Sequence, residues 1–541
     1  MNTLLWALTL LADGQEPLPS QPVKFNVKDF GAKGDGVARD TQALQAAVAA
    51  ANADPEGGVV YLPAGTYLLD STLVVERANV VLRGDGANAT TIYIPNSLSD
   101  VFTGTWVNVS GKVKSSWDSS GGFITFKGRK QTSLLVGPLL ANIAGNVEPG
   151  DFRLPVDSTA KFQAGQPVRI WVNDESTTGV SSGTDKAPAA GLPGEAAGGD
   201  EGLPVPDWVK QDPTYQAALA AGQGMEEPED GSDGGGGSRD GGGEAGGGGK
   251  VYGDNMADSG PDSGILSRDQ IAFTARVAAI GEGWVELDRP MSFAVREWWK
   301  GVVHVEQPSL QDAGMEKLTI RFKHSMFGDH FSDRGYNAIQ AVSGVNLFFS
   351  EINIINCDNG INLFFVDHST VQDVTIDVTS PRWGRDRAKD AFNGHHPITV
   401  TMGHSNLITR FSINAKWIHD LSVAYGASLN AFTAGRGLDL NVDHHRAGPW
   451  ANLFTNINVG CGSRPFFSSG RQGKGAHDGK PSRRPLELPG CDLGPLLNFV
   501  GAFVKPNCRT KMKWLVEALN ASSPADLHRA QVAARRAASV R

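Results

Sequence analysis

The sequence predicts an all-β fold, a right-handed parallel β-helix solenoid, on three observations. First, a motif of the form apolar-x-x-apolar-x-apolar recurs every 21 to 25 residues, with two longer steps of 34 and 37. Second, the apolar positions alternate as in strands that bury one face. Third, Gly and Asn separate the motifs, and such a period is typical of solenoids. In chain order the motifs are Met315/Leu318/Ile320, Phe349/Ile352/Ile354, Val371/Val374/Ile376, Ile408/Phe411/Ile413, Leu429/Phe432/Ala434 and Phe454/Ile457/Val459.

A leucine-rich repeat has a similar period, but its LxxLxLxxN consensus is missing from the chain. That repeat class is therefore disfavoured.

The first residues carry a weak secretion signal. Leu4 to Ala12 form a short apolar stretch, and a charged, Pro-rich segment follows. No basic residue precedes the stretch, and Leu10 is larger than the residue preferred three positions before a cut at Ala12. We expect residues 1–23 to be a signal peptide and leader, and the protein to be secreted. Three glycosylation sequons fit this expectation, at Asn88, Asn108 and Asn520.

Composition narrows the possible partners. The 541 residues carry a formal net charge of −9, whereas nucleic-acid binding calls for a basic footprint. No run approaches the roughly 18 apolar residues of a membrane span. We therefore expect no nucleic acid, no membrane span and a monomer. The four cysteines lack the CxxC spacing of zinc sites, and either disulfides or buried thiols fit Cys357, Cys461, Cys491 and Cys508.

The first ordered segment contains a predicted helix. Asp40 can cap a helix whose apolar face comprises Leu44, Ala47, Val48 and Ala51. Such a helix can cover the open end of a solenoid, whose first coil would otherwise expose its core. The glycines before it do not form the GxGxxG or GxxxxGK[ST] motif, so a phosphate-binding loop is disfavoured.

The same segment carries a family resemblance. FGAKGDGVARDTQALQAAV, followed by GGVVYLPAGTYLL and NVVLRGDG, closely resembles the opening of the rhamnogalacturonase/epimerase-like pectate-lyase domain family, within the pectin-lyase-like superfamily. The resemblance is strong from residue 24 to about residue 94. It implies a right-handed parallel β-helix over residues 24–508 and a polysaccharide as the substrate and partner.

Three regions depart from the repeat. Residues 176–264 are Gly-rich and low in complexity, which predicts a disordered insertion. The sequences that flank it predict two halves of one strand pair.

The loop from Pro381 to Asp390 contains Trp383 and three arginines, and suits either a carboxylate-binding wall or a solvated loop. Residues 509–541 are rich in Ala and Arg and predict a helical C-terminal tail.

Titratable residues are concentrated late in the repeats. His396, His419 and His444 are 23 and 25 residues apart. Because residues one period apart stack about 4.8 Å from each other, we expect a file of imidazoles along the solenoid. The alternative interpretation is that these histidines are hydrogen-bonded turn residues with a structural role. Asn406 and Asn452 are expected to belong to a structural ladder of stacked asparagines. Beside the file lie Asp420, Arg436, Asp439, Asp443, Arg446 and Arg464.

Two reactions fit these residues, and the resemblance does not choose between them. β-Elimination on a uronic-acid polymer needs a base for the C5 proton, cations beside the carboxylate and an acid for the leaving oxygen. Near-neutral imidazoles suit the base and arginines suit the carboxylate clamp. The base candidates are His419, His444 and His445, and the substrate-binding candidates are His396, Arg436, Arg446, Trp450 and Arg464.

Hydrolysis instead requires two carboxyl groups about 5 Å apart for retention, or about 6.5–9.5 Å apart for inversion. Asp420 and Asp443 are 23 residues apart and are expected to face each other across one coil, with Asp439 as a third candidate. The paired aspartates, Gly-His-Gly and Arg-x-Lys motifs of the related polygalacturonases are missing. We therefore favour a lyase.

A non-catalytic polysaccharide-binding or cell-wall protein is the third hypothesis. It predicts a groove of exposed aromatic side chains, for which Trp417, Trp450 and Phe466 lie close in sequence to the histidines. No loop has a ligand pattern that specifies a metal, and no metal ligands are assigned. Ca²⁺ is a possible cofactor because it assists many β-helix lyases.

Overall fold

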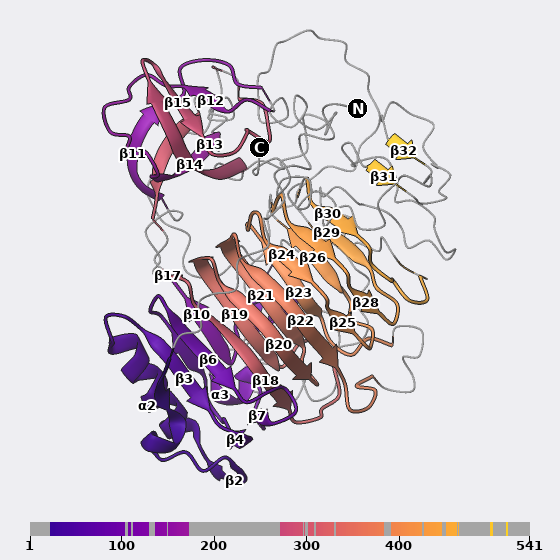
Figure 1. Ribbon diagram of the computed structural model, residues 1–541. Coiled ribbons are helices and arrows are strands. Elements are labelled where there is room, and N and C mark those ends of the chain that lie inside the picture. Colours follow the sequence, from indigo (N-terminus) through magenta and orange to yellow (C-terminus); the bar gives the residue numbers. More distant parts are fainter. Residues whose placement is uncertain are drawn as a thin grey trace.

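The computed structural model shows a parallel β-helix with a second, antiparallel sheet beside it (Figure 1). The described residues are 22–102, 106–109, 112–118, 120–128, 136–148, 150–172, 271–295, 297, 301–307, 310–328, 332–383, 391–424, 427–445, 449, 451–462, 464, 498–500 and 515–517.

One long parallel sheet runs the length of the solenoid. Five shorter strands extend it: β2 (Asp35–Arg39), β4 (Gly65–Leu68), β7 (Thr90–Ile94), β25 (Ser412–Ile413) and β28 (Arg436–Gly437). Its main path is β1 (Val23–Asn26), β3 (Gly58–Leu62), β6 (Val80–Gly84), β18 (Gly314–Phe322), β20 (Phe348–Ile355), β22 (Thr370–Asp377), β24 (Leu407–Thr409), β27 (Ala431–Thr433) and β30 (Leu453–Thr455).

A second parallel sheet faces the first across the core. Since one coil supplies a strand to each sheet, the apolar residues of both sheets meet in one continuous core. Its strands are β5 (Leu73–Val75), β10 (Ile124–Lys127), β19 (Asn337–Val345), β21 (Asn359–Asp367), β23 (His396–Thr401), β26 (Leu421–Ala424) and β29 (Val442–His445), and β17 (Leu310–Gln311) pairs with β19.

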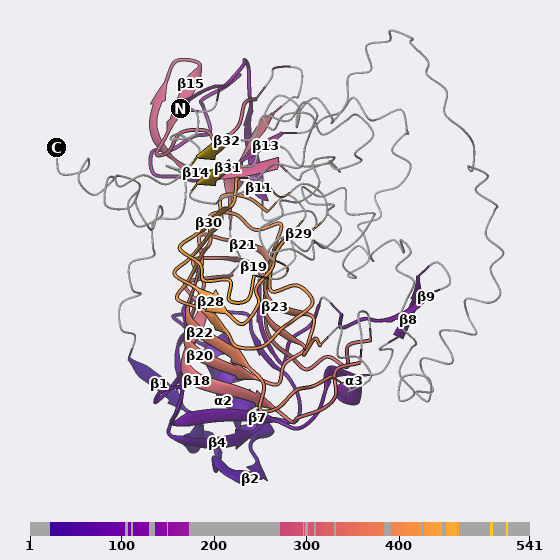
Figure 2. The ribbon, with the colours of Figure 1, turned by 90° about the vertical axis from the view of Figure 1, so that its right-hand side faces the viewer.

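The solenoid continues across a long interruption of the sequence. β6 pairs in parallel with β18, and β10 pairs with β19, so the coil that ends near residue 128 is followed in space by the coil that begins at residue 310. Figure 2 shows β18, β20 and β22 stacked as neighbouring rungs.

The apolar motif has a backbone cause. In the first four motifs the residue just before the second apolar position has a positive φ: Lys317 (61°), Glu351 (54°), Asp373 (53°) and Arg410 (50°). This left-handed residue turns the chain between two short strand segments, which explains why two residues separate the first two apolar positions. The paired register confirms the motifs from Met315 to Ile413.

The prediction of the fifth motif is wrong by three residues. Phe432, rather than Leu429, is the register partner of Ile408. Ala434 then takes the left-handed position, with φ 53°, in line with Arg410. Leu429 itself has φ 60° and packs against the core of the antiparallel sheet.

The predicted N-terminal helix is present as α2 (Thr41–Ala53), which lies at the end of the solenoid and contacts β1, β3 and β5 (Figure 1). Its predicted apolar face is buried. Asp40 precedes the helix but does not cap it: its carboxylate accepts hydrogen bonds from the amides of Lys33 and Gly34, at 2.6 and 3.1 Å. Two short helices, η1 (Val27–Phe30) and α3 (Leu98–Val101), complete this region.

Six antiparallel strands form a separate sheet with its own apolar core. β13 pairs with β14, which confirms that the sequences flanking the Gly-rich segment form one strand pair; the segment itself lies outside the described residues. The strand order is β11 (Val136–Asn142), β16 (Val302–Glu306), β13 (Pro167–Val172), β14 (Ile271–Gly281), β15 (Trp284–Leu287) and β12 (Arg153–Pro155).

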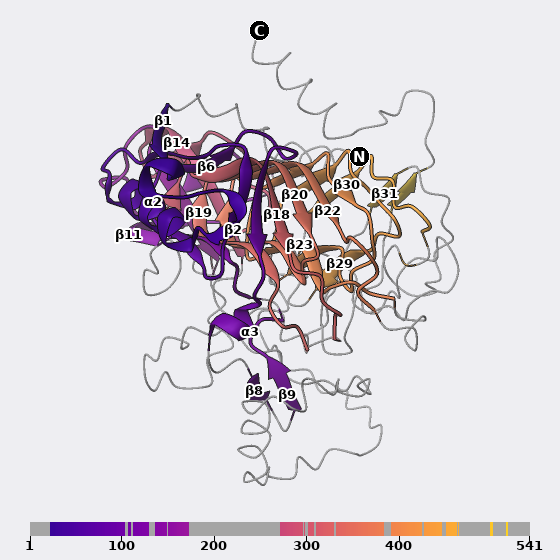
Figure 3. The same cartoon turned by 90° about the horizontal axis from the view of Figure 1, so that it is seen from below.

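Two further strand pairs lie apart from these sheets. β8 (Trp106–Val109) and β9 (Lys112–Ser115) form a hairpin that projects from the solenoid (Figure 3). β31 (Asn498–Val500) pairs with β32 (Leu515–Glu517), so the tail contains a strand where the sequence predicted helix. The rest of the tail lies outside the described residues, and so do residues 1–21 of the predicted signal peptide and leader (residues 1–23). No described helix has the length and apolar character needed to cross a bilayer.

Candidate functional site

Three histidines meet at the start of strands β23 and β26, and we call His395, His396 and His419 the imidazole cluster. The ring centroids of His395 and His396 are 4.2 Å apart, and those of His396 and His419 are 4.8 Å apart. One ligand nitrogen from each ring lies within 4.8 Å of the others. All three residues are buried. The predicted stack of His396 on His419 is therefore present.

The prediction that His444 continues this stack is wrong. His396 and His419 each stand two residues before a register pair, Ile398 and Leu421. The equivalent residue in the next coil is Leu440, because Leu421 pairs with Val442. His444 instead pairs with Val423, a residue of the interior row.

The environment of His444 is accordingly apolar. Its ring lies 5.5 Å from that of Phe454, and burial lowers the pKa of His444 to about 4. At neutral pH this imidazole is uncharged and faces the core, which argues against the predicted role of His444 as a base that reaches a polymer.

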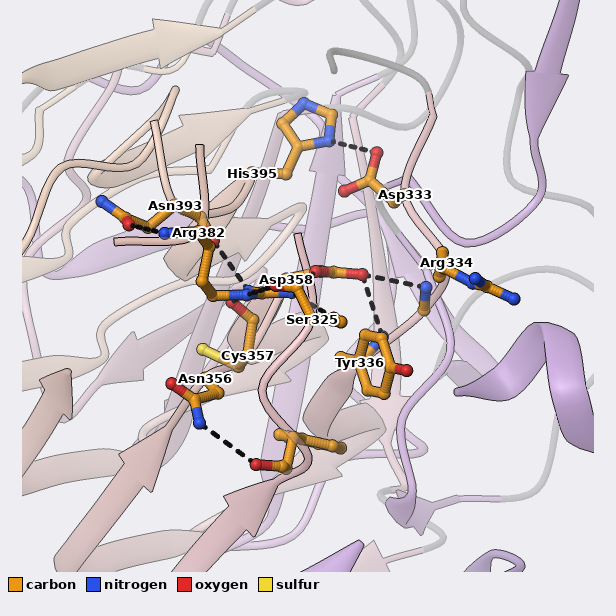
Figure 4. A network of polar contacts seen from close by, with 12 residues as sticks. Ser325, Asp333, Arg334, Tyr336, Asn356, Cys357, Asp358, Arg382, Asn393 and His395 are labelled. Atoms are coloured by element: carbon orange, nitrogen blue, oxygen red, sulfur yellow. Dashed lines mark hydrogen bonds and ion pairs between the residues drawn. The ribbon is translucent and has the colours of Figure 1, made fainter. Parts of the chain in front are cut away.

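Each imidazole in the cluster has a polar partner at Nδ1. Asp333 Oδ2 lies 3.3 Å from His395 Nδ1, as Figure 4 shows, and Asp443 Oδ2 lies 3.0 Å from His419 Nδ1. Ser422 Oγ is 3.3 Å from His396 Nδ1, and it donates to Asp443 Oδ2 at 3.1 Å.

Asp333 and His395 were missed by the sequence argument. A repeat spacing of about 23 residues selects one residue from each coil, and here it selects His396 rather than its neighbour His395. Asp333 precedes β19 and carries no repeat signal. Burial, together with the nearby Asp358 and Asp118, raises the pKa of Asp333 well above its usual range, so this carboxyl group favours its protonated form beside His395.

A second cluster of charges lies next to the first. Arg464 donates to Asp420 Oδ2 at 2.5 Å, and its Nε lies 3.7 Å from Asp439 Oδ2. Lys416 Nζ lies 3.4 Å from the same oxygen of Asp439. The Asp420 carboxylate also accepts from the amides of Trp417 and Asn441. Burial raises the pKa of Asp420 to about 6, even though Arg464 opposes the shift.

The predicted aspartate pair is not a facing pair. Asp443 is the register partner of Ser422, and Asp420 exchanges hydrogen bonds with Asn441, so the two aspartates are offset along neighbouring coils. They also have separate partners, because Asp420 binds Arg464 and Asp443 contacts His419. The structure therefore contradicts the expectation that they face each other across one coil.

The remaining predicted site residues lie elsewhere. Arg436 is exposed on the long sheet, where its Nε donates to Ser412 Oγ at 3.1 Å, and it lies outside both clusters. His445 ends β29, but its side chain is outside the described part of the chain. Arg446 and Trp450 also lie outside the described residues.

Arg382 belongs to a buried network below the imidazole cluster (Figure 4). Its guanidinium donates to Asp358 Oδ1 at 2.6 Å and to the Asn393 carbonyl at 2.7 Å. Asp358 in turn accepts from the amides of Gly335 and Tyr336. Arg382 thus holds three coil segments together, and it belongs neither to a solvated loop nor to a sugar-binding wall.

Asn ladders support the coils on either side, as predicted for Asn406 and Asn452. Asn406 donates to Asn430 Oδ1, and Asn430 donates to Asn452 Oδ1, each at 2.9 Å. A shorter ladder leads to the imidazole cluster: Asn359 donates to Asn337 Oδ1, and its own Oδ1 accepts from the amide of His396.

The two cysteines in the described part of the chain lie outside the imidazole cluster. Cys357 is a buried free thiol whose pKa burial raises to about 12, and Cys461 is an exposed free thiol. The other two cysteines lie outside the described residues.

Comparison with known proteins finds a family model that matches the N-terminal segment. Residues 24–126 match the family described as Rhamnogalacturonase A/epimerase, pectate lyase-like. This confirms the resemblance seen in the sequence. The matched residues form the first coils and α2, whereas both charged clusters lie in later coils.

The similar curated proteins match over the same short stretch. The chain is 39% identical over 97 residues to alginate lyase 7 of Azotobacter vinelandii, which is 17% of this chain and 11% of that protein. It is 43% identical over 100 residues to mannuronan C5-epimerase AlgE3 of the same organism, which is 17% of this chain and 5% of that protein.

Solved structures match over more of the chain at low identity. The tailspike protein gp49 from Pseudomonas phage LKA1 aligns with 82% of this chain and 62% of its own, at 12% identity and a TM-score of 0.40. DFA-IIIase from Arthrobacter chlorophenolicus A6 aligns with 80% of this chain and 66–69% of its own across two ligand-bound forms, with a TM-score of 0.30.

Proposed function

We propose that this protein is a secreted carbohydrate-active enzyme that cleaves a uronic-acid-containing polysaccharide by β-elimination. The observation that carries the proposal is the His419–Asp443 pair within the imidazole cluster, in a chain whose first coils resemble an alginate lyase and mannuronan epimerases. Elimination and C5-epimerisation of a uronate share a first step, the removal of the C5 proton. A base and a charge-neutralising group are required for that step.

His419 is the base in this proposal. Asp443 lies 3.0 Å from Nδ1, which orients the ring and stabilises the imidazolium that forms when Nε2 accepts a proton. The proton comes from C5 of the uronate, the C5 electron pair forms the double bond to C4, and the bond from C4 to the glycosidic oxygen breaks. Asp333, protonated beside His395, is the candidate donor to the leaving oxygen.

Burial sets a condition on this mechanism. His419 and Asp443 are closed to solvent, so a sugar reaches Nε2 only when the side chains over the cluster move. Arg464 is engaged by Asp420 and Asp439, which makes it a poor carboxylate clamp unless the substrate displaces one of them.

The other two hypotheses have less support. A hydrolase needs an acid and a base that flank one bond. Here Asp420 and Asp443 are offset and separately engaged. A binding protein predicts exposed aromatic residues, but Trp417 is fully buried in the solenoid core. The imidazole cluster does not suit Ca²⁺, because Ca²⁺ prefers several oxygen ligands and the cluster offers nitrogen. A Ca²⁺ site elsewhere in the chain stays a prediction.

The test is incubation of the secreted protein with acidic and neutral polysaccharides in D₂O. Ultraviolet absorbance of the unsaturated product, reducing ends and C5 deuterium are followed together. We expect new absorbance on a uronate polymer, and a loss of about 100-fold or more in His419→Gln. His324→Gln is the control, because His324 is exposed and contacts Ser380.

Each other outcome overturns part of the proposal. C5 deuterium without absorbance identifies an epimerase, and reducing ends without absorbance identify a hydrolase. No reaction on any substrate contradicts enzymatic cleavage of these polymers. Full activity in His419→Gln contradicts the role given to His419.

A further inference from the structure

We propose that the imidazole cluster binds one divalent first-row transition metal ion, with zinc as the ion to test. This inference goes beyond the proposed function and does not require it. The two assign different roles to His419, because a single Nε2 lone pair cannot bind an ion and accept a proton at the same time, so His419 acts as the base only in the metal-free protein. It contradicts the sequence-based expectation of no metal ligands, which considered cysteine spacing and calcium loops.

The three imidazoles supply a set of nitrogen donors close enough together for one metal ion. His395, His396 and His419 place one ligand nitrogen each within 4.8 Å of the others. Tetrahedral zinc with Zn–N bonds of about 2.0–2.1 Å needs nitrogens about 3.3 Å apart. The rings must therefore approach by roughly 1.5 Å or less, which side-chain rotation can supply. Three imidazoles with an open fourth position are a recurrent zinc ligand set.

The polar groups at the Nδ1 atoms of the three rings also suit a metal site. Metal-binding histidines commonly give their second ring nitrogen to a carboxylate, a carbonyl or another polar group, which selects the tautomer and orients the ring. Here the Nδ1 atoms of His395 and His419 face Asp333 and Asp443, and that of His396 faces Ser422. Nε2 is then the nitrogen available to a metal in all three rings.

The backbone of the three histidines is held by hydrogen bonds. The amide of His395 donates to the Asp358 carbonyl at 2.8 Å, that of His396 to Asn359 Oδ1 at 3.1 Å, and that of His419 to the His395 carbonyl at 2.9 Å. Three coil segments therefore fix the backbone of the three histidines before any ion arrives, while their rings can still rotate. Such preorganisation favours metal binding.

The nearby charge agrees with a cation at this place. Imidazole binds a metal ion through the lone pair of a ring nitrogen. The Asp443 carboxylate lies beside the cluster and can balance part of the charge of the ion. A purely structural stack that continues the Asn337–Asn359 ladder is the competing explanation, and it predicts no metal.

The test uses the full chain with any affinity tag removed. Metal content is measured after purification, after chelator treatment, and after reloading with Zn²⁺ at known free concentration. Co²⁺ substitution adds a spectroscopic readout, since tetrahedral cobalt with nitrogen ligands absorbs strongly in the visible range. We expect His396→Gln to lose one bound ion per chain relative to the unchanged protein, together with the tetrahedral cobalt spectrum.

Two further variants keep the test decisive. Asp443→Asn retains all three ligands and removes a carboxylate partner, so we expect the affinity for Zn²⁺ to fall by about 10- to 100-fold. His324→Gln alters an exposed histidine outside the cluster and should bind as the unchanged protein does. Circular dichroism checks that each variant is folded. If His396→Gln does not fold, the Zn²⁺ affinity of Asp443→Asn tests the proposal instead.

The outcomes separate this proposal from the proposed function, which shares His419. Equal metal content in the unchanged protein and His396→Gln, or no bound metal at saturating Zn²⁺, overturns the metal site. If the chelated, metal-free protein cleaves a uronate polymer at full rate, His419 stays the base and the cluster is not a metal site in catalysis. Bound zinc without activity on any polymer keeps the site and overturns the proposed function.

Discussion

At the scale of single residues, burial decides what each histidine can do. His404 shows this away from the imidazole cluster: it is buried, its Nδ1 lies 2.7 Å from Ser428 Oγ, and burial lowers its pKa to about 3. Burial, rather than a nearby carboxylate, therefore sets the charge of this side chain. It is a structural histidine, neutral throughout the physiological range of pH.

The protonation of His404 makes stability depend on pH. The unfolded chain binds a proton at His404 below about pH 6.5, whereas the folded chain does not until about pH 3. Stability therefore rises with pH across this window, by up to about 1.4 kcal/mol per pH unit from this residue, and is lost as the pH falls.

Urea unfolding between pH 4.5 and pH 7 measures this slope. We expect His404→Gln to have a shallower slope than the unchanged protein, and His324→Gln to keep the full slope because His324 is exposed. Identical slopes in all three proteins would show that His404 is protonated equally in the folded and unfolded chains.

At the scale of the elements, the left-handed residue of each coil controls which side chains face inward. Glu351 has φ 54° and is exposed, so its side chain is replaceable without loss of core packing. A β-branched residue is strained in this region of φ and ψ, while Asn tolerates it. We expect Glu351→Val to destabilise the fold by about 1–2 kcal/mol and Glu351→Asn to be neutral or stabilising.

The matched control for this prediction is Gln372→Val. Gln372 lies on β22 immediately before the left-handed Asp373, in a strand conformation that favours Val. Thermal and urea unfolding compare the three variants. If Val is as well tolerated at position 351 as at position 372, the left-handed turn does not govern the repeat.

At the scale of the whole molecule, one buried ion network joins the antiparallel sheet to the solenoid. Arg169 on β13 donates to Glu306 on β16 at 2.6 and 3.1 Å, and it also pairs with Asp367 at the end of β21. All three side chains are buried. One guanidinium on the antiparallel sheet is therefore shared by a carboxyl group of the same sheet and a carboxyl group of the solenoid.

Removal of the shared cation tests this connection. Arg169→Met leaves two buried carboxyl groups without their cation, and we expect a loss of about 3–5 kcal/mol in the free energy of unfolding, with faster proteolysis of the antiparallel sheet. Arg153→Met breaks the exposed pair with Glu286 on the same sheet and should cost less than about 1 kcal/mol. Similar losses in both variants would show that the network does not join the two bodies.

The sequence by itself determined the features that repeat. Its period predicted the parallel coils, the 3.6-residue pattern after Asp40 predicted α2, and the sequences around the Gly-rich segment predicted the pairing of β13 with β14. It also predicted the stack of His396 on His419 and the Asn ladder. These features depend on local periodicity, which a single sequence contains.

Only the tertiary structure decided the register and the partners of the site. The coils differ in length, so Phe432 rather than Leu429 is the register partner of Ile408, and His444 lies in register with Val423. Asp333 reaches His395 from a loop that precedes another coil, across 62 residues of sequence. A shift of one residue moves a side chain to the other face of a strand, and contacts between coils depend on stacking, so neither is visible in the spacing alone.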